Sequence, residues 1–132
     1  MSNVKKLRQL ILTTPDKPGM LAEVTGVLAV QGVNIEAICA YVMKGEAIFY
    51  LVTQDNDKAK QALQAKGWPI KEEEVVLVEI ENRPGVLANI SNKLKTQNAN
   101  LSYCYGTACT GPCACPIILK SDNNDSIIKA LE

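Results

Sequence analysis

The 132-residue chain contains no histidine, and this absence narrows the chemistry that it can carry out. Histidine is the commonest general base near neutral pH and the commonest metal ligand. No nucleophile–base pair, catalytic pair of carboxylates or phosphate-binding loop stands out either. We therefore expect a protein that is not an enzyme and that needs no cofactor.

An excess of charge of one sign and a long apolar run are also missing. Lys plus Arg number 14 and Asp plus Glu number 14, so the formal net charge is zero and no basic surface for nucleic acid is implied. No apolar run approaches the roughly 20 residues of a membrane helix, and the N-terminus lacks the apolar segment of a signal peptide. Five cysteines, an odd number without a secretion signal, fit a reducing compartment. We expect a cytoplasmic protein without nucleic-acid or membrane partners.

What the chain does contain is one motif written twice. Residues 16–22 read DKPGMLA, and residues 82–88, 66 positions further on, read NRPGVLA. Each copy follows a short apolar run and opens a segment with helical period. The shift predicts two repeats, residues 1–73 and 74–132, each near the lower size limit for an independent core. Each repeat should gain stability by packing against its twin or against a second chain.

The same order of elements is predicted in both repeats. In the first, apolar periodicity predicts a strand over residues 7–14, a helix over about 18–31, strands over 34–43 and 46–53, a helix capped by Asp55 or Asn56, and a short strand over 68–73. In the second, it predicts a strand over residues 75–81, a helix, strands over 101–105 and 114–120, and a helix over 122–131.

This order predicts an α+β fold made of two ferredoxin-like βαββαβ units, each an antiparallel sheet with two helices on one face. The second repeat lacks its last strand, so one edge of its sheet is either bare or completed from elsewhere. Apolar stripes at helical spacing predict the buried face of the first helix in each repeat. The stripes are Leu21, Val24 and Leu28, and Leu87, Ile90 and Leu94.

The two Pro-Gly turns, the helix after each, and the segments VNI and ANL that lead into the next strand resemble ACT domains in tandem. The likeness runs from about Leu7 to Leu131 and is to small stand-alone double-ACT proteins, which are mostly described as amino-acid-binding. ACT domains are regulatory modules, and their effector amino acids lie where two ACT units meet, against the loop between the first strand and the first helix. The resemblance therefore implies an amino-acid effector and a homodimer.

Each Pro-Gly turn stands at the mouth of a helix, where free main-chain N–H groups and the positive end of the helix dipole suit a small anion. In the first repeat we expect the N–H groups of Gly19, Met20 and Leu21 to hold a ligand carboxylate, and Asp16 or Asn34 to accept from its ammonium group. The candidate ligand-binding residues are Asp16, Pro18, Gly19, Met20, Leu21, Asn34, Asn82, Pro84, Gly85, Val86, Leu87 and Asn100.

One other interpretation of these residues stays open at this point. Asp16 can simply cap the helix while Pro18 and Gly19 form a turn that binds nothing. If both turns bind, they should not bind identically, because Asn82 is neutral where Asp16 is charged and a carboxylate holds an ammonium group more strongly than an amide does.

Four cysteines, Cys104, Cys109, Cys113 and Cys115, fall within the segment SYCYGTACTGPCACP between two predicted strands. Four thiols this close can in principle hold zinc or an iron–sulfur cluster, or form a redox-responsive pair. Their spacing, C-x4-C-x3-C-x-C, does not match the C-x2-C pairs of familiar zinc sites, so no metal site is predicted. The alternative function is a metal- or redox-responsive module, and a third interpretation is that the thiols are inert, small and buried.

Overall fold

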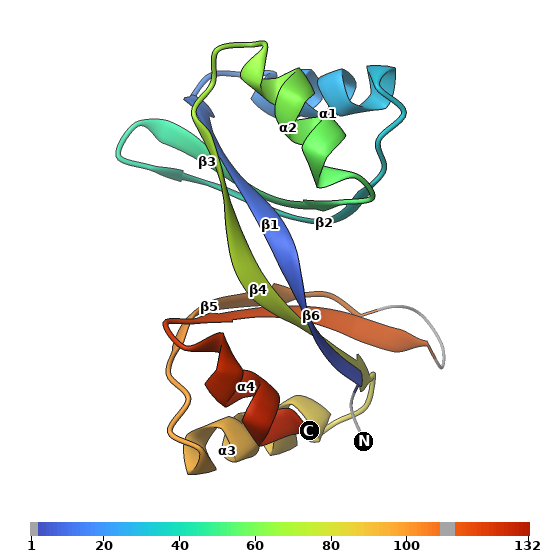
Figure 1. Cartoon of the computed structure of the whole chain (residues 1–132), viewed down its shortest axis with the longest axis vertical. Coiled ribbons are helices and arrows are strands. Elements are labelled where there is room, and N and C mark those ends of the chain that lie inside the picture. Colours follow the sequence, from blue (N-terminus) through green and yellow to red (C-terminus); the bar gives the residue numbers. More distant parts are fainter. Residues whose placement is uncertain (1–2, 109–112) are drawn as a thin grey trace. The chain divides into compact units, whose positions relative to one another are not determined.

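The computed structural model describes residues 3–108 and 113–132, which divide into two units. The first unit is Arg8–Glu73, and the second combines residues 3–7 with residues 74–132. The chain therefore crosses between the units twice, once before Arg8 and once after Glu73. In each unit, two helices lie on one face of the strands (Figure 1).

The first unit contains most of the first repeat. Its elements are β1 (Asn3–Pro15), α1 (Met20–Val30), β2 (Ile35–Met43), β3 (Glu46–Thr53), α2 (Asn56–Gln64) and the beginning of β4 (Ile70–Glu81). The strand order is β2-β3-β1-β4, and β3 pairs in the antiparallel direction with both β1 and β2. The core beneath the helices includes the fully buried Leu10, Leu28 and Leu51.

The second unit has the same architecture. It adds α3 (Val86–Thr96), β5 (Leu101–Gly106), β6 (Ala114–Ser121) and α4 (Asn124–Leu131) to the rest of β4. Its strands follow the order β5-β6-β4-β1, in which β1 contributes residues 3–7. Val4 of this segment packs against the core that contains Val78 and Ile127. The α+β, ferredoxin-like prediction is thus confirmed, and the place of the missing last strand is taken by residues from the beginning of the chain.

The boundaries of two strands differ from those predicted. The sequence indicated a strand over residues 68–73 and another over 75–81, whereas the structure has one continuous strand, β4, from Ile70 to Glu81. Residues 71–74 read KEEE and include neither Pro nor Gly, so nothing in the local sequence forces a break. Similarly, β1 begins at Asn3 and not at residue 7, because its first residues pair within the second unit.

The predicted buried stripe is wrong at its first position in both repeats. Leu21 is 56% exposed and Leu87 is 52% exposed, while Met20 is buried and Val86 is half-buried. The helices begin at Met20 and Val86, so the buried face runs through every fourth residue from these positions. Two large apolar side chains, Leu21 and Leu87, are therefore left at the surface, each two residues after the glycine of a Pro-Gly turn.

No helix in the described part of the chain has both the length and the apolar character that are needed to cross a bilayer.

Candidate functional site

The two Pro-Gly turns have nearly identical backbone geometry. Gly19 and Gly85 are the residues directly before α1 and α3, and they adopt left-handed conformations with φ of 89° and 90°. An L-residue with a side chain rarely adopts this conformation, which explains why glycine stands at both positions. No side chain caps either helix at these positions.

The start of each helix leaves main-chain donors available. An α-helix provides no i−4 acceptor for its first N–H groups. The N–H of Val86 donates to the Arg83 carbonyl at 3.4 Å, but among the described residues no acceptor is found for the N–H groups of Gly85, Leu87 and Ala88. The first turn matches this pattern, because Met20 donates to Lys17 at 3.4 Å. Met20, which we expected to bind the ligand, thus already has a long hydrogen bond within the turn.

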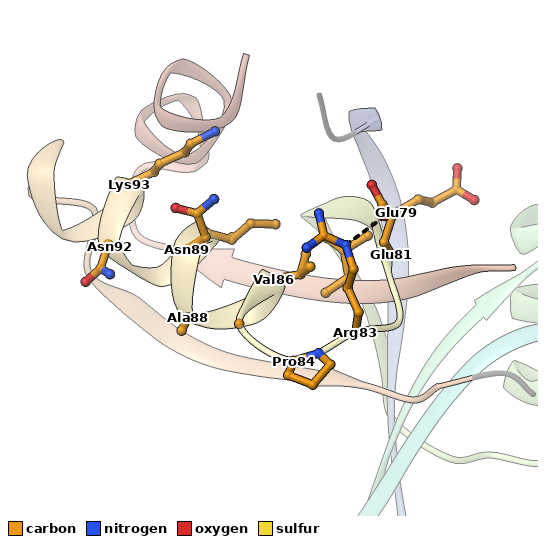
Figure 2. Close-up of a pocket in the computed structure, with 12 residues that line it drawn as sticks. Glu79, Glu81, Arg83, Pro84, Val86, Ala88, Asn89, Asn92 and Lys93 are labelled. Atoms are coloured by element: carbon orange, nitrogen blue, oxygen red, sulfur yellow. Dashed lines mark hydrogen bonds and ion pairs between the residues drawn. The ribbon is translucent and has the colours of Figure 1, made fainter. Parts of the chain in front are cut away.

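A cavity of about 520 Å³ lies beside the second Pro-Gly turn, residues 82–85 (Figure 2). It is bounded by the end of β4, by the turn and by the first turns of α3. The lining residues are Glu79, Ile80, Glu81, Arg83, Pro84, Gly85, Val86, Ala88, Asn89, Ile90, Asn92 and Lys93. Three of the residues that the sequence indicated, Pro84, Gly85 and Val86, therefore meet at this cavity.

Charged groups of both signs line this cavity. Arg83 Nε donates to Glu81 Oε2 at 2.9 Å, and Figure 2 shows this pair at the β4 end of the site. The hydrogen bond from Arg83 and then its positive charge lower the pKa of the Glu81 carboxyl. Glu79 Oε1 accepts from the Asn3 side chain at 3.0 Å, while Lys93 lies further along α3 (Figure 2). A small molecule with both a carboxylate and an ammonium group finds partners for each here.

A smaller cavity of about 260 Å³ adjoins the same turn. It shares Ile80, Glu81 and Arg83 with the larger cavity, so both cavities border the same turn. Its other lining residues are Asn82 and Leu87, which the sequence indicated, and Gly106, Thr107, Ala108, Cys115 and Ile117 from β5, β6 and the residues after β5.

The structure does not bring Asn34 or Asn100 to the turn of its own unit. Each asparagine follows a helix of 11 residues that begins at the turn, and a helix of this length is about 16 Å long. Asn100 lines a separate cavity of about 340 Å³ together with Asn98 and Leu101. One small ligand cannot touch both an asparagine of this pair and the turn that precedes it in the same unit.

The first Pro-Gly turn, residues 16–19, is exposed throughout. Pro15 lies opposite Glu46, which in turn lies opposite Met43, so the turn stands at the same end of the sheet as the tip of the β2–β3 hairpin. Asp16 and Pro18 are therefore accessible at this end of the first unit, next to the exposed side chain of Leu21.

The cysteines occupy different environments. Cys115 is buried and free, Cys104 is exposed and free, and Cys113 is disulfide-bonded. Cys109 lies outside the described residues. Among the residues that the structure does describe, no group of three or more Cys, Asp or Glu side chains is placed to hold a metal ion.

Sequence reasoning missed the acidic residues at the end of β4. Glu79 and Glu81 line the larger cavity, but in the sequence they look like the ordinary polar positions of a strand in which apolar and polar residues alternate. A comparison of the two repeats could have indicated these two glutamates, because the residues 66 positions earlier, Thr13 and Pro15, carry no charge. The gain of two carboxylates in front of only one turn distinguishes the second turn from the first.

Each unit is a ferredoxin-like sheet with an open turn at the start of a helix, and comparison with known proteins indicates the family. Residues 8–66 match the model of the ACT domain, which supports the ACT family for this chain. ACT domains are regulatory, non-catalytic modules that bind small molecules, often amino acids, and that commonly oligomerise. A search of curated proteins found no match.

Several solved structures have the same fold. Protein BT0572 from Bacteroides thetaiotaomicron is 28% identical, with a TM-score of 0.89 over 97% of this chain and 88% of that one. The ligand-free regulatory subunit of aspartate kinase from Thermus thermophilus is 19% identical, with a TM-score of 0.66 over 98% and 97% of the two chains. The corresponding subunit from Thermus flavus is 20% identical, with a TM-score of 0.60 over 98% and 92%. At these identities the two kinase subunits indicate a shared fold only.

Proposed function

We propose that this chain is a cytoplasmic regulatory module that binds a free amino acid at its Pro-Gly turns and catalyses no reaction. The observation that carries the proposal is the larger cavity at the second turn. Main-chain donors of Gly85 and Ala88 line it together with the carboxylate of Glu79 and the guanidinium of Arg83. These groups complement the two charges of an amino acid.

The carboxylate of the ligand accepts from the N–H groups at the start of α3. The positive end of the helix dipole favours an anion there, and Arg83 adds a positive charge at the same turn. The ammonium group donates to Glu79, because Glu81 already accepts from Arg83 at 2.9 Å. Glu79 uses Oε1 for the hydrogen bond from Asn3, which leaves Oε2 for the ligand.

The first turn binds in a related but different way. The residues that correspond to Glu79 and Glu81 are the uncharged Thr13 and Pro15, so Asp16 is the carboxylate that the first turn itself supplies. We expect the two turns to differ in affinity and in the amino acid that they prefer.

A homodimer completes the proposed sites. Asn34 and Asn100 lie a helix length away from the turns of their own units, so we expect them to contact a ligand at a turn of the partner chain. Two of the structures with this fold are regulatory subunits of aspartate kinase, which supports a regulatory role.

Thermal melting in the presence of each of the twenty amino acids tests the proposal. An amino acid at one hundred times its dissociation constant should stabilise the protein by about 2.7 kcal/mol. Glu79→Gln should weaken this effect, whereas Lys71→Gln, which changes an exposed residue of the same strand outside the cavity, should not. Absence of a shift with all twenty amino acids would remove the proposed function.

A redox-responsive module is a second candidate function, and the disulfide bond of Cys113 favours it. Thiol titration in denaturant, with metal analysis of anaerobically purified protein, tests this candidate. It predicts fewer than five reactive thiols before reduction and five afterwards. Five reactive thiols at the outset and no bound metal would discard both the redox-responsive and the metal-responsive versions.

A further inference from the structure

We infer that the smaller cavity at the second turn receives the side chain of the bound amino acid and restricts this site to neutral amino acids with a compact apolar or sulfur-containing side chain. This inference rests on the proposed function, because it names the class of ligand that the second turn selects. It is carried by the chemistry of the cavity wall, by the position of Leu87 and by the close packing of β5 against β6.

One part of the wall of this cavity is apolar, while Glu81, Asn82, Arg83 and Thr107 line the rest. Ile80 is 7% exposed and Cys115 is 3% exposed, and the half-buried Ile117 lies beside them on β6. Cys115 carries a free thiol, which behaves as a small polarizable hydrophobe and forms only weak hydrogen bonds. A charged or amide group of a ligand side chain that lies against Ile80, Cys115 and Ile117 would lose its water there without gaining a comparable partner.

The two charged residues at the mouth of the cavity compensate each other. Arg83 Nε donates to Glu81 Oε2 at 2.9 Å, so the opposite charges of the two residues lie close together at the mouth. The charged side chain of a lysine or aspartate ligand would meet one residue of like charge next to one of opposite charge. The pair therefore gives no net attraction to a charged side chain, while the ligand's carboxylate and ammonium group are bound in the adjoining cavity.

Leu87 provides an independent indication of an apolar ligand. It lines the smaller cavity and is 52% exposed, although its main-chain N–H is one of the donors without an acceptor among the described residues. A molecule that places a carboxylate at this N–H can cover the leucine side chain with its own apolar group. Removing both apolar surfaces from water favours that molecule over one with a polar side chain.

The packing of β5 against β6 limits the size of the ligand side chain. A methyl group added at Gly106 would lie 2.3 Å from Ile117 Cδ1 and 2.8 Å from the Pro116 carbonyl oxygen. The two strands are thus already in close contact at this wall. The cavity cannot widen on this side unless β5 moves away from β6, so the wall favours a compact side chain.

The first turn provides the matched control. The pairs Glu81–Ala114 and Pro15–Glu46 align β6 with β3, so the position of Cys115 corresponds to Ala47 in the first unit. Leu21 is 56% exposed and corresponds to Leu87. Leu21→Ser and Leu87→Ser are therefore equivalent surface changes at two different turns, and neither removes a buried side chain.

Amide NMR spectroscopy tests the inference, because the signals of Gly19 and Gly85 report the two turns separately. Titrations with alanine, valine, leucine, methionine, lysine and aspartate should show a preference of at least about tenfold for the neutral apolar and sulfur-containing ligands over lysine and aspartate at Gly85. Leu87→Ser should weaken leucine and methionine binding at Gly85 by about tenfold. Leu21→Ser should leave that binding unchanged.

A second variant tests the cavity from the opposite wall. Cys115→Val enlarges a buried side chain by about one methyl group, and should weaken binding of leucine and methionine relative to alanine, with the protein fold checked in the same spectra. Equal binding of lysine and leucine at Gly85, or unchanged leucine binding in Leu87→Ser, overturns the inference and leaves amino-acid binding intact. If no amino acid shifts either glycine signal, the proposed function itself fails.

Discussion

Asn124 holds Glu74 in place: its side-chain Nδ2 donates to the main-chain carbonyl of Glu74 at 2.9 Å, while its Oδ1 accepts from the N–H of Ser121 at the same distance. Asn56 does the same in the first unit, where its Nδ2 donates to the carbonyl of Arg8 at 2.9 Å. Glu74 and Arg8 are the residues at which β4 and β1 enter these units. One asparagine at the start of a helix thus ties that helix to the strand that crosses between units.

Replacing Asn124 by alanine should lower the free energy of unfolding by about 1–3 kcal/mol, because two hydrogen-bonded main-chain groups lose a partner at a site that is only 7% exposed. Urea denaturation measures this change. Asn123→Ala is the control, because the Asn123 side chain makes no capping bond and should cost less. Equal losses in the two variants would contradict the role of Asn124.

Alanine substitutions at two glycines should have opposite effects on stability. At Gly85, φ is 90° and an added methyl group meets nothing within 4 Å, so the cost comes only from the left-handed backbone and should be about 1–2 kcal/mol. Gly26 lies inside α1, where an added methyl group also meets nothing, and Gly26→Ala should stabilise by about 0.5–1 kcal/mol. Thermal melting of both variants tests the predicted difference in sign.

Two substitutions in α1 test which of its apolar residues belong to the buried face of the helix. Leu28 is fully buried, so Leu28→Ala should cost about 2–5 kcal/mol through lost burial and the cavity left behind. Leu21 is 56% exposed, and Leu21→Ala should stay within about 0.5 kcal/mol of the original protein. Comparable losses in urea denaturation would mean that Leu21 is buried, contrary to the structure.

Deleting residues 3–7 should destabilise the second unit more than the first, because it uncovers the edge of β4 and removes Val4 from the core. Hydrogen exchange should become faster in β6 and α4 but remain slow in the β2–β3 hairpin. Lys6 also contacts Glu74 and Asp125, but these are surface ion pairs. Lys6→Gln, which removes only the ion pairs, should therefore change stability by less than about 1 kcal/mol.

The Arg83–Glu81 pair should be visible as a shifted titration. The hydrogen bond and charge of Arg83 lower the pKa of Glu81 below its ordinary value of 4.5, and Arg83→Gln should raise it again. Because the pKa is lower in the folded state, the stabilisation is present above pH 4.5 and is lost as the pH falls through the folded pKa. NMR titration of the carboxyl carbon measures the shift, and Lys17→Gln should leave it unchanged.

Much of the fold was predictable from local patterns. The strand boundaries Glu46 and Thr53 follow from the apolar pattern, and the structure confirms them. Gly32 and Asn98 adopt left-handed conformations, which these two residue types tolerate best. The first helical residue did not follow from such a pattern. Met20 and Leu21 are both apolar and both suit a helical stripe with Val24, so only packing against the sheet decides which one is buried.

The candidate site, too, could be predicted from the sequence only in part. The Pro-Gly turns were visible in the sequence, because a left-handed glycine before a helix has a local signature. The cavities were not visible, because they depend on where Glu79, Arg83 and Cys115 meet, and these residues come from different elements. The distance of Asn100 from Gly85 likewise required the length of the intervening helix as the structure has it.

The sequence by itself therefore determined the two repeats, the order of their elements and the open donors at the two helix mouths, since all of these depend on neighbouring residues. Tertiary structure decided that residues 3–7 complete the sheet of the second unit and that two cavities flank Gly85. These features depend on contacts between residues that are far apart in the chain, and the free energy of such contacts is set by burial and hydrogen bonding in the folded state.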